Sequence, residues 1–217
     1  MKKTIQIAAL LLALCLLMCG CKKKDPYADI PNPVATITMA NGSVMQFELF
    51  LSDAPNTVAN FVELSNAGFY DGLPFHRVVP GVLIQSGDPA GDGTGNAGHV
   101  IQGEFSANGI QNNVTHSRGT ISMSRHEDDY DSASSQFFIL QGTHPSFDGK
   151  YAAFGRAVDE NTLVVIDTIA STPIDGSYAP VGNVPRIATI RVETHGYYYE
   201  ADTRDFPGPE ETEAPAA

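Results

Sequence analysis

The segment that most constrains the fold is residues 70–88, which reads Y-D-G-L-P-F-H-R-V-V-P-G-V-L-I-Q-S-G-D. Asp71-Gly72 and Pro80-Gly81 are turn signals, and the residues between and after them are rich in β-branched and aromatic side chains. The pattern predicts two short strands, residues 73–79 and 82–85. A chain built around such a segment is expected to be rich in β-structure.

Arg77 stands out in this apolar segment because a guanidinium cannot lose its charge and presents five hydrogen-bond donors. Half-burying that group on a strand costs free energy unless something accepts its hydrogen bonds. Two interpretations stay open at this point: the acceptor is a substrate, or it is a neighbouring carboxylate that only braces the sheet.

Further strands are predicted along the chain. Asn41-Gly42 is a strong hairpin signal between residues 34–39 and 43–51, where apolar and polar side chains alternate. The other strand-like segments are residues 119–124, 135–141, 149–158 and 186–193. Many short strands with tight turns predict a mostly β fold, a closed or nearly closed antiparallel barrel.

Two helices are predicted beside these strands. Asp53 offers a capping side chain, Pro55 suits a first helical turn, and apolar residues follow at helical spacing until Gly68. Residues 161–169 are the second helical segment.

The N-terminus reads as a targeting segment. Lys2-Lys3 precede an apolar run over residues 5–18, and Met18-Cys19-Gly20-Cys21 resembles the lipobox of a bacterial lipoprotein signal. The interpretation is a signal peptide at residues 1–20, then a lipidated Cys21 opening a Pro-rich tether over residues 21–33. It places the protein outside the cytoplasm, anchored to the membrane; an ordinary signal peptide and an uncleaved anchor are the alternatives. We expect a globular domain at residues 34–200 and a disordered acidic, Pro-rich tail at 201–217.

Charge and motifs exclude several function classes. The formal net charge is −12, so the basic face that nucleic-acid binding requires is not expected. The histidines lack zinc-site spacing, the acidic residues 125–131 lack a calcium-loop pattern, and no G-x-S-x-G is present. Gly93-x-Gly95-x-x-Gly98 matches a dinucleotide fingerprint, but no amphipathic helix follows it, so we expect a surface loop. No metal or cofactor is predicted.

Four motifs taken together identify a family. They are F-H-R-x-x-P-G-x-x-x-Q from Phe75, G-T-I-S-M from Gly119, S-S-Q-F-F-I from Ser134 and F-D-G-K-Y-A-A-F-G from Phe147. In this order and spacing they resemble the cyclophilin family of peptidyl-prolyl isomerases, over roughly residues 34–193. The resemblance implies a closed eight-stranded antiparallel barrel capped by two α-helices, and an enzyme that rotates X-Pro bonds.

The chemistry of that reaction suits these residue types. Amide resonance creates a barrier of about 18–20 kcal/mol, and no bond is broken, so no nucleophile is required. In the twisted state the proline nitrogen regains a lone pair, and a fixed cationic donor stabilises that state more than the planar amide. By resemblance, Arg77 is this catalytic donor.

The resemblance also assigns the rest of the site. Gln85 is expected to hydrogen-bond the substrate backbone. The residues expected to line the proline pocket are Leu83, Met123, Phe138 and Phe147. The residues expected at the rim are His76, Gly93, Ser124, Arg125 and Gln136. Met123 and Leu83 have core positions as their alternative, and because Phe137 and Phe138 share a strand, only one ring can face the pocket.

Three positions depart from the family pattern. Val82 stands where an aromatic residue is usual, Ser146 where many members have Trp, and Tyr151 where many have His. Val82 and Tyr151 are still expected to contact substrate. Without the indole, we expect weak cyclosporin binding with catalysis retained.

The sequence thus predicts a monomeric, lipid-anchored prolyl isomerase that acts on proline-containing polypeptides and assists the folding of secreted or envelope proteins. The rival interpretation is a non-catalytic module that binds proline peptides. Retention of both Arg77 and Gln85 favours the enzyme.

Overall fold

The fold is seen in a computed structural model that describes residues 26–205. The chain divides into two units, residues 1–30 and 31–217. In the first unit, residues 26–30 form a turn closed by a hydrogen bond from the Ile30 N–H to the Tyr27 carbonyl. The predicted signal peptide, the lipidation site Cys21 and residues 206–217 of the predicted tail lie outside the described residues.

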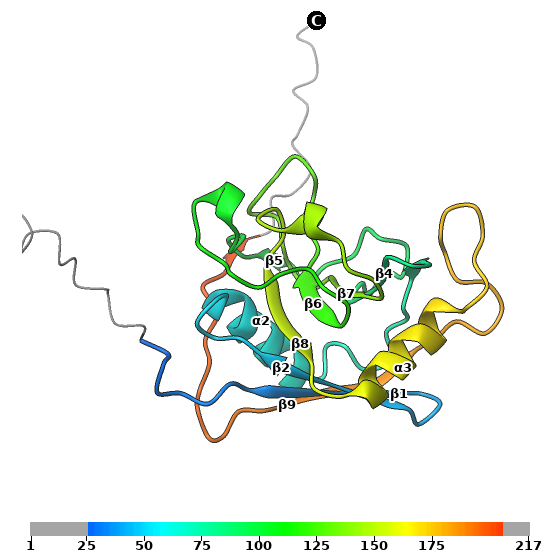
Figure 1. The fold of residues 1–217 in the computed structure, drawn as a ribbon, viewed down its shortest axis with the longest axis horizontal. Helices are drawn as coiled ribbons and strands as arrows, with labels where there is room; N and C mark the ends of the chain where they lie inside the picture. Colours follow the sequence, from blue (N-terminus) through cyan, green and yellow to red (C-terminus); the bar gives the residue numbers. More distant parts are fainter. Residues whose placement is uncertain (1–25, 206–217) are drawn as a thin grey trace, which may run out of the picture. The chain divides into compact units, whose positions relative to one another are not determined.

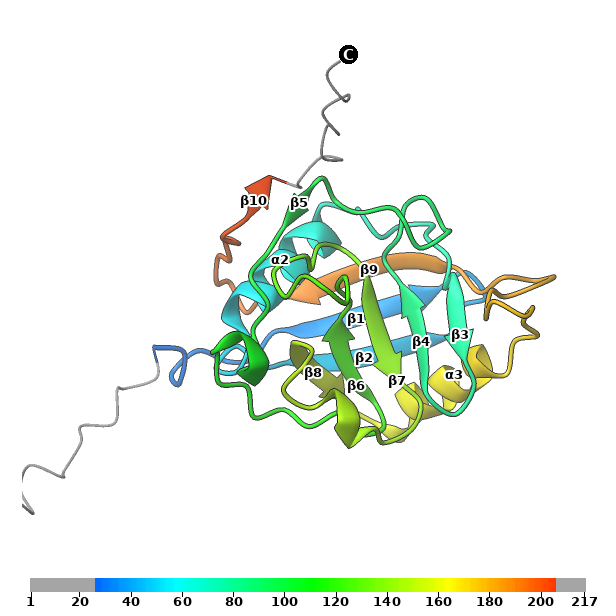
Figure 2. The same ribbon diagram turned by 90° about the horizontal axis from the view of Figure 1, so that it is seen from above.

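The second unit is built on one antiparallel sheet of eight strands in the order β3-β4-β7-β6-β8-β2-β1-β9. The strands are β1 (Val34–Met39), β2 (Val44–Leu49), β3 (Arg77–Val79), β4 (Leu83–Ser86), β6 (Thr120–Met123), β7 (Phe137–Leu140), β8 (Ala153–Ala157) and β9 (Ile187–Glu193). Figure 2 shows β3, β4, β6 and β7 in front of β1, β2 and β9, so the sheet curves back on itself. Each predicted strand segment overlaps an observed strand.

The first hairpin forms as predicted. Gly42 has φ +86°, a conformation that glycine adopts without strain, and Asn41 Oδ1 accepts from the Ser43 backbone N–H at 3.0 Å. Met45, Phe47 and Leu49 are fully buried, whereas the residues between them face outward. The alternation read from the sequence therefore places one face of β2 in the core.

Complete closure of the barrel is not confirmed. The sheet ends in β3 and β9, which form no ladder with each other. Three backbone hydrogen bonds join the segment before β3 to the start of β9: Gly72 N–H to Ile187, Phe75 N–H to Pro185, and Ile187 N–H to Leu73. The expected closed barrel is thus an open eight-stranded sheet whose edges approach each other at one end.

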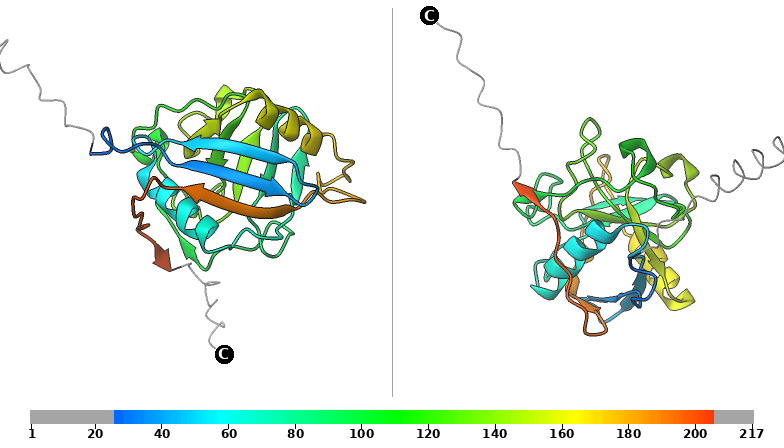
Figure 3. Two further views of the ribbon diagram at one scale, coloured as in Figure 1. Left: turned by 90° about the horizontal axis from the view of Figure 1, so that it is seen from below. Right: turned by 90° about the vertical axis from the view of Figure 1, so that its left-hand side faces the viewer.

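Two α-helices accompany the sheet, α2 (Pro55–Asn66) and α3 (Glu160–Ala170), and they lie on opposite sides of β1 and β2 (Figure 3). Asp159 caps α3 by accepting from the Thr162 N–H at 2.8 Å. Both helices form where the apolar spacing predicted them.

The predicted cap of α2 is wrong. Asp53 makes no capping bond, and its carboxylate accepts from Asn113 instead. N–H groups of the first helical turn, which have no partner within the helix, are satisfied by Glu104: its two oxygens accept from the Asn56 N–H at 3.1 Å and the Thr57 N–H at 2.7 Å. Burial raises the pKa of Glu104, against the lowering effect of these hydrogen bonds. A residue 47 positions away in the sequence replaces the local cap.

The core between α2 and the sheet is aromatic. Phe61 of α2 lies with its ring centroid 5.3 Å from Tyr70, 5.4 Å from Phe137 and 5.2 Å from Phe154, and all four side chains are fully buried. The Tyr70 hydroxyl donates to the Ser135 carbonyl at 3.1 Å, so its polar group is satisfied.

Four short elements were not expected from the sequence. β5 (His99–Val100) pairs with β10 (Arg204–Asp205), so the predicted tail contains a strand at its start. The 3-10 turns Ser106–Asn108 and Pro145–Phe147 also fall in segments given no structure by the sequence pattern. Among residues 26–205, no helix combines the length and the apolar character needed to cross a bilayer.

Candidate active site

The site begins at the strands that place Arg77, Gln85 and Phe138 side by side. Arg77 is paired with Gln85 across β3 and β4, and Gln85 is paired with Phe138 across β4 and β7. Residues opposite each other in register project to the same face of a sheet. Arg77 and Gln85 from one hairpin, and Phe138 from a distant strand, therefore share the outer face.

Arg77 is exposed and is held by one side-chain hydrogen bond, from its Nη1 to Gln85 Oε1 at 3.1 Å. No ion pair involves Arg77 in the described part of the chain. The open interpretation in which a carboxylate neutralises Arg77 is therefore not what the structure has. The guanidinium keeps its charge and most of its donors free for a ligand.

Gln85 is the centre of an amide network. Its Nε2 donates to Gln136 Oε1 at 2.9 Å and to Ser124 Oγ at 3.3 Å. Gln136 Nε2 donates in turn to the carbonyls of Gly93 and Gly95, at 3.0 and 2.9 Å. This network ties the glycine-rich loop to β4 and fixes the orientation of the oxygen that holds Arg77.

A groove of about 630 Å³ opens beside Arg77. The predicted site residues that line it are His76, Arg77, Val82, Leu83, Gln85, Gly93, Ser124, Arg125, Phe138, Phe147 and Tyr151. Gln136 lines a smaller adjoining cavity of about 120 Å³, together with Gln85, Gly93, Ser124 and Arg125. Most of the predicted site is thus brought together on one surface.

Met123 is the exception. It is 1% exposed and lines neither the groove nor the smaller cavity, so its assignment to the proline pocket is wrong. Its neighbour in register is Phe137, which faces the interior. Met123 therefore belongs to the core, the alternative that the sequence left open.

The floor of the groove is apolar. Leu83, Phe138 and Leu140 form a buried cluster, against which Val79, Val82, Phe147 and Tyr151 pack. The rings of Phe138, Phe147 and Tyr151 make three mutual edge contacts, with centroids 5.4 to 5.9 Å apart. As expected, Phe138 faces this pocket while Phe137 faces the interior. Such a surface suits a proline ring.

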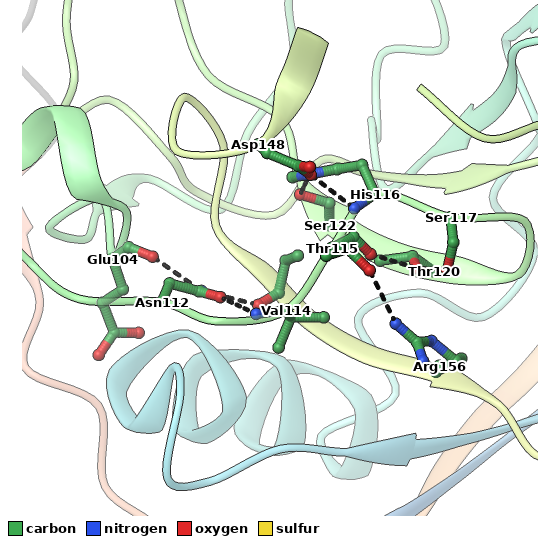
Figure 4. A network of polar contacts seen from close by, with 11 residues as sticks. Glu104, Asn112, Val114, Thr115, His116, Ser117, Thr120, Ser122, Asp148 and Arg156 are labelled. Atoms are coloured by element: carbon green, nitrogen blue, oxygen red, sulfur yellow. Dashed lines mark hydrogen bonds and ion pairs between the residues drawn. The ribbon is translucent and has the colours of Figure 1, made fainter. Parts of the chain in front are cut away.

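A buried histidine, His116, supports this aromatic wall from behind, and Figure 4 shows it beside Asp148 and Ser122. His116 is 1% exposed, stacks on Phe138 at 6.1 Å, and lies between Asp148 Oδ1 and Ser122 Oγ, each 3.0 Å from a ring nitrogen. Burial lowers the pKa of His116, although Asp148 opposes the shift. The neutral ring donates from Nδ1 to Asp148, which leaves Nε2 to accept from Ser122. No sequence motif predicted that His116 would pack behind the aromatic wall.

Arg125 is fixed at the rim by aromatic and carbonyl groups. Its guanidinium carbon lies 4.8 Å from the Tyr130 ring centroid and 4.9 Å from that of Tyr151. Its nitrogens donate to the carbonyls of Lys150, His126 and Glu127. The acidic loop that follows is therefore folded around Arg125, and the described residues contain no cluster of metal-ligating side chains.

The glycine-rich loop is organised by Asp88. This fully buried carboxylate accepts from the backbone N–H groups of Ala90, Asp92 and Gly93. A Cβ at Gly95 would lie 2.1 Å from Asp88 Oδ1, which explains that glycine without a nucleotide. The dinucleotide fingerprint is a coincidence of loop packing.

The sequence missed one wall of the groove. Ser177 and Ala179, from the long segment between α3 and β9, also line it. The Val78 N–H donates to the Tyr178 carbonyl at 2.9 Å, and Asp175 Oδ1 accepts from Ser177 and Ala179. The only available signal was the run of turn-forming residues, which does not indicate where a loop folds.

Comparison with known proteins agrees with this geometry. The family model for cyclophilin type peptidyl-prolyl cis-trans isomerases matches residues 34–192. A peptidyl-prolyl cis-trans isomerase of Synechococcus elongatus is 43% identical over 58% of this chain and 81% of the relative. One of Helicobacter pylori is 42% identical over 62% of this chain and 78% of the relative.

The fold gives the same result. The crystal structure of a Cryptosporidium parvum cyclophilin type peptidyl-prolyl cis-trans isomerase, determined in the presence of the dipeptide Ala-Pro, superposes with a TM-score of 0.65. It is 30% identical and covers 74% of this chain and 98% of that chain. With its half-barrel of eight strands, two helices and an arginine beside an aromatic groove, this chain belongs to the cyclophilin family of peptidyl-prolyl cis-trans isomerases.

Proposed function

We propose that Arg77 catalyses the rotation of X-Pro bonds in the 630 Å³ groove. The observation that carries this proposal is the state of Arg77: an unneutralised guanidinium, oriented by Gln85, beside the apolar cluster of Leu83, Phe138 and Leu140. The cluster binds the proline ring, and the guanidinium lies beside the position of the imide.

The mechanism follows from differential binding. In the planar imide the nitrogen lone pair is delocalised into the carbonyl, so it accepts no hydrogen bond. In the twisted state the lone pair localises on nitrogen and accepts from Arg77, and a preorganised donor in a partly enclosed site contributes about 2.7–4 kcal/mol. A rate gain of roughly 10⁵ requires about 7 kcal/mol. The remainder comes from orienting the client and removing water around the imide.

Gln85 has a supporting role in this proposal. Its Oε1 accepts from Arg77 and has a second lone pair for an N–H of the client backbone. Its Nε2 is occupied by Gln136 and Ser124, which prevents the amide from turning over. Gln85 thereby fixes both the cation and the peptide backbone.

The test is a protease-coupled assay on a peptide with one X-Pro bond. Arg77→Ala is expected to lower kcat/KM by about 10²- to 10³-fold. Arg77→Lys is expected to recover only part of this loss, because a lysine lacks the planar fork that Gln85 orients. Arg118→Ala is the matched control, since Arg118 is an exposed arginine paired with Asp167 and lines neither groove nor cavity. Equal, near-background rates in wild type and Arg77→Ala would support the non-catalytic peptide-binding module.

We also propose that the enzyme is a monomer that acts outside the cytoplasm on secreted or envelope proteins, anchored by a lipid on Cys21. The support is the sequence of residues 1–24, with two basic clusters around an apolar run and a lipobox-like tetrapeptide. Mass spectrometry of the mature N-terminus should find a diacylated Cys21, and Cys21→Ser should release the protein from the membrane fraction. An unmodified N-terminus, or a membrane-bound Cys21→Ser protein, would contradict the anchor.

A further inference from the structure

A second cavity, of about 520 Å³, adjoins the proline groove. The two share His76, Gly91 and Ala179, so a chain leaving the groove past His76 enters this cavity directly. We propose that it is a client subsite that binds an acidic side chain a few residues from the proline, through Arg186. The inference rests on the proposed function and names a preference of the same site.

The cavity has a built wall. Its outer side is the segment between α3 and β9, represented by Ala179, Pro180, Val184 and Arg186. Isolated bridges join Ile174 to Pro180 and Pro74 to Arg186, and the Phe75 N–H donates to the Pro185 carbonyl at 2.9 Å. The first bridge closes the wall segment on itself, and the contacts of Pro74 and Phe75 hold that segment against the residues that lead into β3.

His76 forms the partition between the two cavities. The residue is 9% exposed, and its two ring nitrogens make no hydrogen bond with residues 26–205. Burial lowers the pKa of His76, although Asp88 opposes the shift. The nearby Gln136 amide contributes a slight rise to the same pKa, but its oxygen and nitrogen are committed to Gln85 and the glycine-rich loop. Because both nitrogens are buried, His76 acts as a packed partition between the two cavities and not as a hydrogen-bonding group for the client.

The charge of the cavity comes from Arg186. Its side chain is exposed, donates from Nη1 to the Gly72 carbonyl at 3.0 Å, and forms no ion pair in the part of the chain that the structure describes. Asp71, the only carboxylate lining the cavity, is neutralised by Arg191 through hydrogen bonds of 2.8 and 2.7 Å. The wall therefore presents one uncompensated cation.

Neighbouring acids form no ion pair with Arg186 among the described residues. Asp92 lines the proline groove, but its Oδ1 accepts from the backbone and hydroxyl of Thr94. Asp175 accepts from Ser177 and Ala179 within its own loop. Because the whole chain carries a formal charge of −12, a general attraction for acidic clients is not expected. A preference for an acidic residue should therefore be confined to the position that reaches Arg186.

The experiment is a positional scan. Peptides with one X-Pro bond carry Glu, Gln or Lys at each of several positions on either side of the proline, and kcat/KM is measured for the full chain. We expect Glu to exceed Lys by about two- to fivefold at one or two adjacent positions, the size of one exposed ion pair. The advantage should shrink in high salt.

Two variants of Arg186 decide the matter. Arg186→Gln should abolish the preference and Arg186→Glu should reverse it in favour of Lys. The fold should be retained in both, because the hydrogen bond to Ala40 and the bridge to Pro74 use only the backbone of Arg186. Arg118→Gln removes the same charge from outside both cavities and should leave the scan unchanged.

A flat scan, or a preference that persists in Arg186→Glu, would overturn the subsite. A short Ala-Pro peptide that ends before the cavity separates the two proposals. If wild type isomerises it and Arg77→Ala does not, a flat scan contradicts the subsite alone. If neither does, the proposed function fails.

Discussion

Strand β7 separates two aromatic clusters that are built from similar residue types, one in the interior and one at the groove. Phe137 projects into the interior against Phe61 and Tyr70, where every ring is fully buried. Phe138 projects outward against Phe147 and Tyr151, which are only partly buried and line the groove. Adjacent residues on one strand therefore provide stability on one face and a binding surface on the other. Burial alone does not distinguish the two side chains, because Phe138 is only 4% exposed. The exposure of the rings around each side chain does distinguish them.

The largest effect should come from truncating the two rings separately. Phe137→Ala should lower the free energy of unfolding by about 3–5 kcal/mol, because it leaves a cavity in the rigid interior. Phe138→Ala should cost less stability, since its partners can relax into the groove, but should lower kcat/KM more. Urea unfolding and the isomerase assay, both at a temperature where each variant is folded, give the two numbers. Equal stability losses with equal activity losses would remove the distinction between the clusters.

Glu104→Gln should weaken the interior without altering the groove. The amide of Gln would place a donor against the N–H groups of Asn56 and Thr57 at the start of α2, and the expected loss is about 1–3 kcal/mol of unfolding free energy. Asp53→Asn, at the cap that the sequence suggested, is the control and should change stability by less than about 0.5 kcal/mol. An unchanged kcat/KM in both is expected. If Asp53→Asn proved the more destabilising, the capping role of Glu104 would be wrong.

Val82→Phe combined with Ser146→Trp should alter the groove without altering the interior. Val82 packs on the apolar floor, and Ser146 is exposed in the neighbouring 3-10 turn. Aromatic side chains there should raise cyclosporin affinity by about tenfold, close to 1.4 kcal/mol of buried aromatic surface. Calorimetric titration of wild type should find weak binding. A nanomolar dissociation constant for wild type would refute the expectation drawn from these two positions.

The smallest effect is a pH dependence centred on His116, which lies behind the groove wall. Because burial lowers its pKa, the unfolded chain takes up a proton on acidification below about pH 6.5 and the folded protein does not. Stability should therefore fall as pH decreases from about 7 to 5.5, and His116→Gln should show a shallower fall.

Glu104 works in the opposite direction. The pKa of Glu104 is raised in the folded protein. As the pH rises above 4.5, the ordinary pKa of a glutamate, the unfolded chain therefore loses this proton first, and the free energy of unfolding decreases. Urea unfolding at several pH values for His116→Gln and Glu104→Gln separates the two signs. A steeper fall in His116→Gln than in wild type would contradict the neutral, buried imidazole.

Local sequence signals were reliable wherever neighbouring residues decide the structure. Asn41-Gly42 fixed a hairpin, and the spacing of Val58, Phe61 and Val62 fixed the buried face of α2. They failed where a distant segment decides. Asp53 is a good capping residue by type, yet the N–H groups at the start of α2 bond to Glu104. Met123 suits a pocket or a core equally until β7 is placed beside it.

By itself, the sequence determined the segments of the eight-stranded sheet and of the two α-helices, the family, and the convergence of Arg77, Gln85 and Phe138, because the motifs carry their own spacing. Only the tertiary structure decided that Arg77 has no carboxylate partner among residues 26–205, that His116 supports the groove from behind, and that the segment before β9 builds its outer wall. The physical reason is the distance along the chain over which each interaction acts. Propensity and alternation act over a few residues, whereas a side chain's partner is set by segments that meet only when the sheet curves back on itself.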